Sequence, residues 1–267
     1  MDDSSAIFSS SLPDTRAALV IGHPGHELRV HGWLEVARPV VFVFTDGSGR
    51  ANQSRLPSTT RILSRAGATR GSIYGRFTDA NAYAAILNHE FDVFVELAEE
   101  LCEAFAAERI DYVAGDAFEG YNPMHDVCRL IINAAVAAAQ GLRDHRVGNL
   151  GFSLIGQPTA CQQAPHADGI CRRLDDVAFA RKLAAAKGYV ELAGEVHSAL
   201  EHTSADALRV ECLRPVGSAE DLSDQPPFYE SHGEKQVAAG LYTRVLRYQE
   251  HIAPLAEALR RYVERSI

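Results

Sequence analysis

The chain has 267 residues, 46% of them hydrophobic, which is enough to bury a sizeable core in one domain. Its formal net charge of −9 argues against a nucleic-acid-binding surface and against a polybasic membrane anchor. No stretch reaches the roughly 20 apolar residues that a membrane-spanning helix needs. We expect residues 1–15, which are rich in Ser and Asp and lack the pattern of a secretory signal, to form a flexible arm.

Short apolar runs at regular intervals predict the strands of a parallel sheet. Parallel strands that helices cover on both faces read as continuous apolar stretches rather than as an alternating pattern. We therefore expect strands at 17–22, 38–47, 109–117 and 148–156, a weaker one at 72–77, and a late one at 207–216.

Helical patterns separate these runs. We expect helices at 58–68, 88–110, 124–141 and 174–200, and one long closing helix at 234–266. Alternation of strands and helices predicts an α/β fold. The expected architecture is a Rossmann-like, mostly parallel sheet with helices on both faces and a small C-terminal cap, in a single domain over residues 16–267.

The segment "HPGHE" directly follows the first predicted strand, and a second polar segment, "GDAFEGYNPMHD", follows the third. In an open parallel sheet, ligands bind beyond the carboxyl ends of the strands. His23 and His26 are three residues apart, so one turn can bring both imidazoles together. If the two strands are near neighbours, His125 can join them, and three imidazoles are a common ligand set for catalytic zinc.

The spacing alone also allows a structural interpretation, because most histidines make only local contacts. For His31, close to Trp33, we favour such a structural role. The five cysteines are odd in number, are widely spaced and contain no C-x-x-C pair. This pattern favours a reducing compartment over a disulfide framework, and we expect a cytoplasmic protein.

The two polar segments resemble those of the LmbE-like (PIG-L) family of zinc-dependent N-deacetylases. That family carries "HPDDE" after its first strand and "GHPDH" after a later one, where this chain has "HPGHE" and "GYNPMHD". The resemblance covers most of the chain in the order of its elements. It implies a zinc site at His23, His26 and His125, with other divalent transition metals as alternatives.

The chain departs from the family pattern at the residue that moves the proton. The family's general base is the first Asp of its motif, and Gly25 stands at that position. Candidate replacements are the carboxylates predicted at the same edge of the sheet, Glu27, Asp116 and Glu119. Asn122 replaces a His of the second motif and retains a hydrogen-bond donor for an oxyanion.

Several further residues are candidates for substrate binding. Asp46 follows the second strand in "TDGSG", where a simple turn is an equally open interpretation. Arg61 follows the same strand, where the family often places a substrate-contacting Arg, although we favour a solvated position on a helix face. Tyr229 and Lys235 belong to the segment "QPPFYESHGEKQ", which we expect to be a loop able to close over the site.

The resemblance implies a hydrolase that removes an N-acyl group, such as acetyl, from an amino sugar, a glycoconjugate or a related small amide. Two alternatives stay open because of Gly25. One is a divergent metalloenzyme of the same fold with a different reaction, and the other is a non-catalytic binding or accessory protein. A homo-oligomer is possible, since two-fold assemblies are common.

Overall fold

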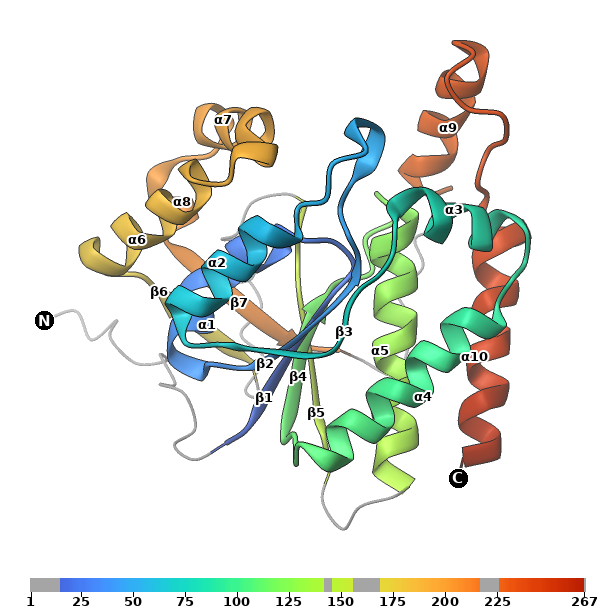
Figure 1. Cartoon of the computed structure of the whole chain (residues 1–267), viewed down its shortest axis with the longest axis horizontal. Coiled ribbons are helices and arrows are strands. Elements are labelled where there is room, and N and C mark those ends of the chain that lie inside the picture. The colour runs from blue at the N-terminus through green and yellow to red at the C-terminus, as the bar shows by residue number, and fades with distance from the viewer. Residues whose placement is uncertain (1–14, 142–145, 156–168, 217–225, 267) are drawn as a thin grey trace, which may run out of the picture.

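The computed structural model describes residues 15–141, 146–155, 169–216 and 226–266 (Figure 1). The predicted N-terminal arm, except for its last residue, lies outside the described residues. In the described part of the chain one seven-stranded sheet runs through the molecule, in the order β3-β2-β1-β4-β5-β7-β6. The strands are β1 Ala17–Ile21, β2 Val40–Thr45, β3 Thr69–Phe77, β4 Tyr112–Asp116, β5 Gly148–Phe152, β6 Ile170–Arg173 and β7 Val210–Pro215.

The five strands β1 to β5 are parallel, and β7 is antiparallel to both β5 and β6. Strand β1 is the centre of the parallel part, with β2 on one side and β4 on the other. The connections that leave β1 and β4 therefore diverge to opposite sides of the sheet. This is the topological switch point, where open α/β sheets have their ligand-binding crevice.

Helices cover both faces of the sheet, as the apolar runs predict. In β1, Ala18 and Val20 face one layer of the core, while Leu19 and Ile21 face the other. The first layer contains α3 Asp79–Leu87, α4 Asp92–Ala107, α5 Pro123–Gly141 and α10 Ala253–Ser266. The second layer contains α1 His31–Ala37, α2 Leu56–Ala66 and α6 Asp176–Lys187 (Figure 1). The predicted fold class is confirmed.

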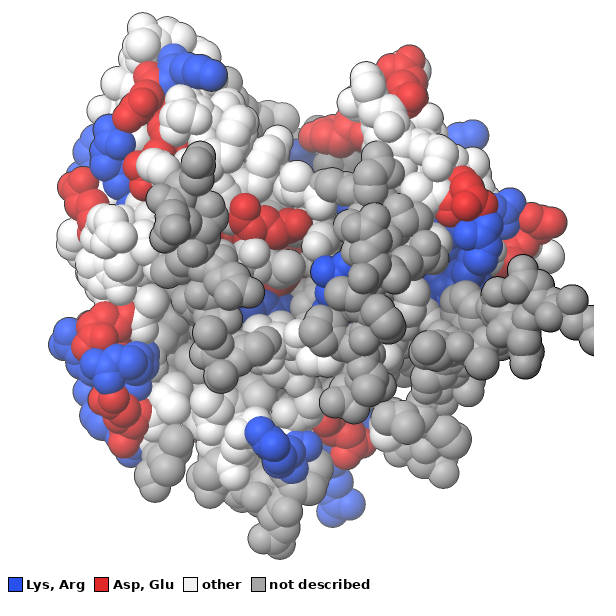
Figure 2. Space-filling model, turned by 180° about the vertical axis from the view of Figure 1, so that it is seen from behind, with Lys and Arg blue, Asp and Glu red and all other residues white. Residues whose placement is uncertain are grey.

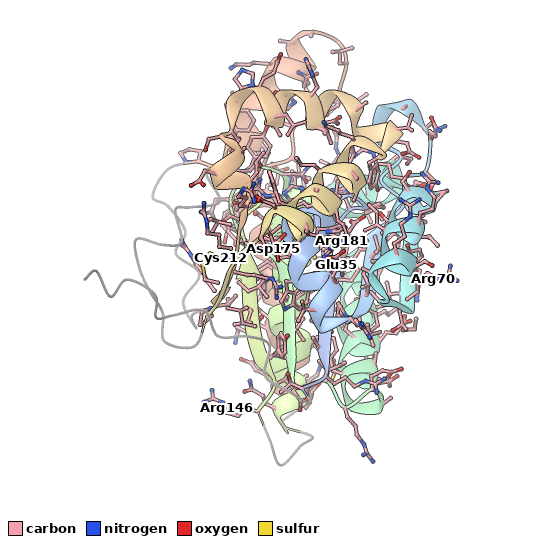
Figure 3. All side chains as sticks on the ribbon, turned by 90° about the vertical axis from the view of Figure 1, so that its left-hand side faces the viewer. Glu35, Arg70, Arg146, Asp175, Arg181 and Cys212 are labelled. Carbon is pink, nitrogen blue, oxygen red and sulfur yellow. The ribbon has the colours of Figure 1, made fainter. Side chains whose placement is uncertain are left out.

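The C-terminal cap consists of α6 and three further short helices. These are η4 Val190–Leu192, α7 Ala193–His202 and α8 Ala205–Leu208. The predicted helix at 174–200 is thus interrupted, because α6 ends at Gly188, where residues 189–192 turn toward α2. Arg181 of α6 donates two hydrogen bonds to Glu35 of α1, which lies next to it in Figure 3. This contact attaches the cap to α1.

The prediction of one long closing helix at 234–266 is wrong. Helix α9 Phe228–Ala238 ends before Gly240, which has a φ of 71°, and a π-helical turn at Tyr248–Ile252 leads into α10. Leu241 and Tyr242 between them are exposed, so the chain leaves the core after α9 and returns to it at Leu246. Two short elements, β6 and α3, have too few residues to give a periodic signal in the sequence.

No helix in the described residues is long and apolar enough to cross a membrane. The thiols of Cys102, Cys128 and Cys171 are free, whereas Cys212 is disulfide-bonded. The disulfide at Cys212 departs from the expectation of reduced cysteines that their number and spacing suggested.

Candidate active site

Three imidazole rings meet at the carboxyl ends of β1 and β4. His23 and His26 follow β1, and His125 lies in the first turn of α5, which follows β4. The ring centroids of His23 and His26 are 5.4 Å apart, those of His23 and His125 also 5.4 Å, and those of His26 and His125 4.6 Å. The predicted convergence of histidines from two separate strands is therefore present in the structure.

The loop that presents two of these rings needs a glycine. Gly25 has a φ of 108°, a backbone conformation that residues other than glycine rarely adopt. Its N–H donates to Glu27 at 2.7 Å, and the other carboxylate oxygen of Glu27 accepts the Thr59 hydroxyl at 2.8 Å. Glu27 is fully buried, and these two hydrogen bonds hold the turn between His23 and His26 in place.

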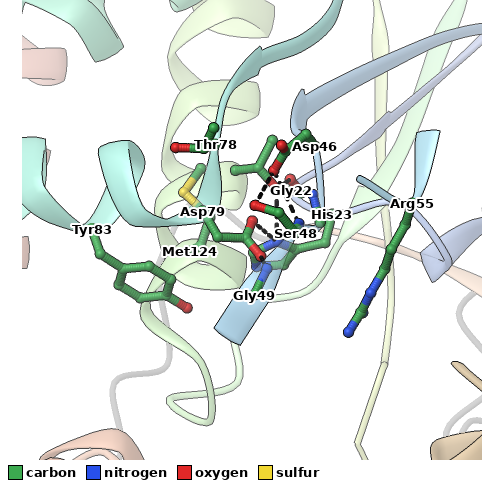
Figure 4. Close-up of polar contacts among 12 residues, drawn as sticks. Gly22, His23, Asp46, Ser48, Gly49, Arg55, Thr78, Asp79, Tyr83 and Met124 are labelled. Carbon is green, nitrogen blue, oxygen red and sulfur yellow. Dashed lines mark hydrogen bonds and ion pairs between the residues drawn. The ribbon is translucent and has the colours of Figure 1, made fainter. Parts of the chain in front are cut away.

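His23 is oriented by a carboxylate from the start of α3. Its Nδ1 lies 3.0 Å from Oδ1 of Asp79 and 2.8 Å from the hydroxyl of Thr45 (Figure 4). Burial opposes ionisation of Asp79, but its hydrogen bonds, first of all the one from His23, outweigh burial and lower the pKa of Asp79. An ionised carboxylate only accepts hydrogen bonds, so Nδ1 of His23 carries a proton and donates it to Asp79.

The sequence analysis missed Asp79. It lies between a weakly predicted strand and an unpredicted helix, and the motif itself contains no hint of it. Its second oxygen accepts the N–H of Gly49 at 2.8 Å, which holds the carboxylate beside His23 (Figure 4). The one available signal is "TDA", where Thr78 caps α3 and places an acid in its first turn.

His26 is oriented in the same way by Asp116 at the end of β4. Its Nδ1 lies 2.9 Å from Oδ2 and 3.0 Å from Oδ1 of this fully buried carboxylate, which also accepts the Gly22 N–H at 2.8 Å. Burial raises the pKa of Asp116, but the neighbouring His26 ring and the hydrogen bonds to the carboxylate outweigh burial, and the net shift is downward. Asp116 is thus a buried anion that keeps the proton of His26 on Nδ1.

His125 completes the cluster without a carboxylate of its own. Burial, with the neighbouring His26 and His23 rings, holds the pKa of His125 well below its usual value, so the ring is neutral. Nδ1 of His125 and Nε2 of His23 are buried and have no hydrogen-bond partner among the described residues. Buried imidazole nitrogens without partners are rare, and ligand binding is one common reason for them.

These residues fit the chemistry of a transition-metal site. Metal-binding histidines usually donate their second ring N–H to a carboxylate, as His23 and His26 do here. As the side chains stand, however, no group of three His, Cys, Asp or Glu in the described part of the chain forms a complete metal site. The rings and their carboxylates are in place, while their donor atoms are not gathered around one point.

The predicted catalytic carboxylates are already engaged within the protein. Glu27 and Asp116 hold the loop and His26, as described above. Glu119 accepts the N–H groups of Leu154 and Ile155, and burial raises its pKa. Asn122 accepts the Tyr83 hydroxyl at 2.9 Å and the Met124 N–H at 2.8 Å through the same oxygen, which leaves its NH2 group as a donor.

The four predicted substrate-binding residues do not form one group. Asp46 accepts the N–H and hydroxyl of Ser48, as a turn residue does, and Arg61 is exposed and donates to Ser58. Tyr229 is buried in α9, and Lys235 of the same helix is exposed. The segment 225–236, predicted as a loop, is thus helical from Phe228 onward.

Two projections of the molecule flank a hollow at this end of the sheet. Seen from behind, α9 and α7 project on opposite sides of it (Figures 1 and 2). On the α9 side, the rings of Tyr121 and Phe228 stack at 4.9 Å, and both residues are partly exposed. On the other side, Arg55 extends beside His23 (Figure 4) and lies 3.7 Å from Glu195 of α7.

No known family model and no curated protein sequence matches the chain. Among solved structures, it is similar to the antimicrobial reagent A40926 pseudoaglycone deacetylase Dbv21, with 20% identity and a TM-score of 0.52 over 77% of this chain and 99% of that chain. It is also similar to the conserved protein TT1542 from Thermus thermophilus, with 13% identity and a TM-score of 0.50 over 79% of this chain and 99% of that chain. At these identities the similarity shows a shared α/β fold.

Proposed function

We propose that this chain is a metal-dependent hydrolase of the LmbE-like type that removes an N-acyl group from an amino sugar, a glycoconjugate or a related small amide. One observation carries the proposal. Three histidines meet at the switch point of the sheet, and two of them are each oriented by a buried carboxylate. The fold shared with a deacetylase of an antibiotic pseudoaglycone supports it.

In this proposal His23, His26 and His125 hold zinc or another divalent transition metal. When bound, such a metal supplies a Lewis acid that polarises an acyl carbonyl and makes water more acidic. Asp79 and Asp116 keep the protons of His23 and His26 on Nδ1, and so leave the Nε2 lone pairs available. A neutral imidazole with a free lone pair is the form that binds a metal.

Asn122 is the residue we propose for stabilising charge on the acyl oxygen. Tyr83 and Met124 fix the orientation of its amide, so its NH2 group can donate in a direction set before the substrate binds. For the substrate we propose contacts with Asp46, Arg61, Tyr229 and Lys235. We also propose that the substrate is a small molecule and that the protein is located in the cytoplasm.

The proton acceptor remains among Glu27, Asp116 and Glu119. Asp116 holds the ring of His26 and its pKa is lowered, which makes it a weak base, whereas burial raises the pKa of Glu27 to about 7, close to the value that suits a general base at neutral pH. The matching experiment compares Asp116→Asn, Glu27→Gln and Glu119→Gln for release of free amine from N-acetylated amino sugars. If all three variants retain wild-type rates, none of the three is the acceptor.

A second candidate function is binding without hydrolysis. Gly25 supplies no proton-transfer group, and each carboxylate named above already has partners within the protein. A protein that keeps the metal but turns over no amide would fit these features. Metal content and turnover therefore need to be measured on the same preparation.

Metal analysis of purified protein tests the proposal. We expect about one zinc or other transition-metal ion per chain after reconstitution, and loss of this ion in His23→Ala and in His125→Ala. The matched control is His202→Ala, since the His202 ring is exposed on α7 and bonded within that helix. If both site variants bind as much metal as the control, the proposed centre is wrong.

A further inference from the structure

The cap closes the histidine cluster on the side of Gly25. A Cβ atom built on Gly25 would lie 2.4 Å from Cδ1 of Leu192 in η4 and 3.7 Å from the hydroxyl oxygen of Tyr189. The first distance is far below any contact between real atoms of this kind. Leu192 therefore takes the space that a side chain at position 25 would need, in the loop that carries His23 and His26.

The backbone that carries Leu192 is firmly held. Tyr189 is fully buried, and its hydroxyl lies 2.9 Å from that of Thr59 and donates to the carbonyl of Arg55 at 3.2 Å. The Leu192 N–H in turn donates to the carbonyl of Tyr189 at 3.1 Å. Thr59 of α2 and Arg55, the N-cap residue of that helix, therefore hold Tyr189, the residue before η4, in place.

A second contact fixes η4 from its middle residue. Glu191 accepts the hydroxyl of Ser58 at 2.6 Å, and Ser58 also accepts a hydrogen bond from Arg61. Thr59, which contacts Tyr189, donates to Glu27 at the same time. These polar contacts connect the cap, through Ser58 and Thr59 of α2, to the loop that carries His23 and His26.

Leu192 is placed to act as an apolar wall. Its side chain is partly buried and packs against the core layer that contains Leu19 and Ile21 of β1, and Gly25 next to it is buried. In the same short helix, Val190 is 75% exposed and takes no part in this packing. An apolar side chain beside a polar cluster limits the size of the group that can be placed next to the cluster.

We propose that Leu192 is a specificity-determining residue that sets the size of the acyl group admitted beside His23 and His26. This inference rests on the proposed hydrolase function. The wall favours a small acyl group such as acetyl, because a longer chain would have to displace a leucine whose backbone is held by Tyr189 and Glu191. Removing the isobutyl side chain opens space next to Gly25 without changing any polar contact of the cluster.

The test compares zinc-loaded wild-type protein, Leu192→Ala and the control Val190→Ala on N-acetyl, N-propionyl and N-butyryl derivatives of one amino sugar. We expect the butyryl-to-acetyl ratio of kcat/KM to rise about 10-fold or more in Leu192→Ala, since one methylene in a fitted pocket is worth about 10-fold or more. Val190→Ala should keep the wild-type ratio. Leu192→Phe should lower the ratio, which provides a second variant if the first is unstable.

A binding measurement separates failure of this inference from failure of the proposed function. Calorimetric titration of the same zinc-loaded proteins with acetate and butyrate should show the same change of preference, whether or not amides are turned over. If wild-type protein binds no metal, the proposed function fails. If it binds metal and neither ratio moves in Leu192→Ala or Leu192→Phe, the role of Leu192 is overturned.

Discussion

Two buried clusters of charge in this molecule are built in opposite ways. Under the cap, Glu211 of β7 accepts the N–H groups of Gly32 and Trp33 at 2.9 and 2.8 Å, and Lys182 of α6 donates to it at 2.8 Å. Glu211 is 3% exposed, and the pair joins the cap to the first turn of α1. Here both carboxylate oxygens have partners within the protein.

At the switch point, the carboxylates of Asp79 and Asp116 also have partners within the protein. The second nitrogen of the His23 ring, however, has none among the described residues. Asp79 and Asp116 occupy one nitrogen each of His23 and His26, and Nε2 of His23 is buried with no hydrogen-bond partner in the described part of the chain. A protein leaves such an atom unsatisfied at a cost of about 1–3 kcal/mol. The comparison separates a cluster whose polar atoms all have partners from one that leaves a buried ring nitrogen without a partner in the described residues.

Removal of Glu211 should have the largest effect on folding. Glu211→Ala leaves Lys182 buried without its anion and two N–H groups at the start of α1 without an acceptor. We expect a loss of about 3–5 kcal/mol in the free energy of unfolding, measured by urea denaturation. Glu96→Ala on the exposed face of α4 is the control and should change stability by less than about 0.5 kcal/mol. Equal stabilities of the two variants would show that the buried pair contributes nothing.

Glu27 should give the metal-free protein a pH-dependent stability. Burial raises the pKa of Glu27 from 4.5 to about 7, so the folded state holds its proton more tightly than the unfolded state. The associated stability is complete below pH 4.5 and is lost as the pH rises through 7, by about 3 kcal/mol in total.

The measurement is urea unfolding of chelator-treated protein between about pH 4.5 and pH 8, which spans both pKa values. Glu27→Gln removes the titrating group, so the difference between wild type and variant should change with pH in the stated direction. A constant difference across this range would mean that Glu27 keeps the same pKa in the folded and unfolded states.

Replacement of Asp79 should affect the histidine cluster more than the fold. Asp79→Asn removes the anion beside Nδ1 of His23, and loss of such a partner typically weakens metal binding about 10–100-fold. Asp92→Asn is a matched control, because Asp92 stands in the first turn of α4 as Asp79 does in α3. Competition with a chromogenic chelator measures the affinities, and equal values for both variants would exclude a role for Asp79.

Much of the parallel sheet could be predicted, because buried strands leave continuous apolar runs such as "AALVI" and "VVFVFT". The convergence of His23, His26 and His125 follows from the same prediction, since neighbouring strands end at the same edge. Adjacent placement of β1 and β4 was the one assumption required, and the sheet order bears it out.

Contacts between segments far apart in the sequence could not be predicted. Asp79 reaches His23 across 56 residues, and Leu192 fills the space above Gly25 from the cap. Neither residue belongs to a motif, and each comes close to the histidine loop only because the fold brings it there. The interruptions at Gly188 and near Gly240 were also missed, because helical spacing continues in the sequence across both.

X-ray diffraction at the zinc edge, on crystals of the reconstituted protein, tests the central claim most directly. The proposed centre predicts one strong anomalous peak at about 2.0–2.1 Å from a nitrogen of each of His23, His26 and His125. A peak elsewhere, or no peak among these three rings in zinc-reconstituted protein, would contradict it.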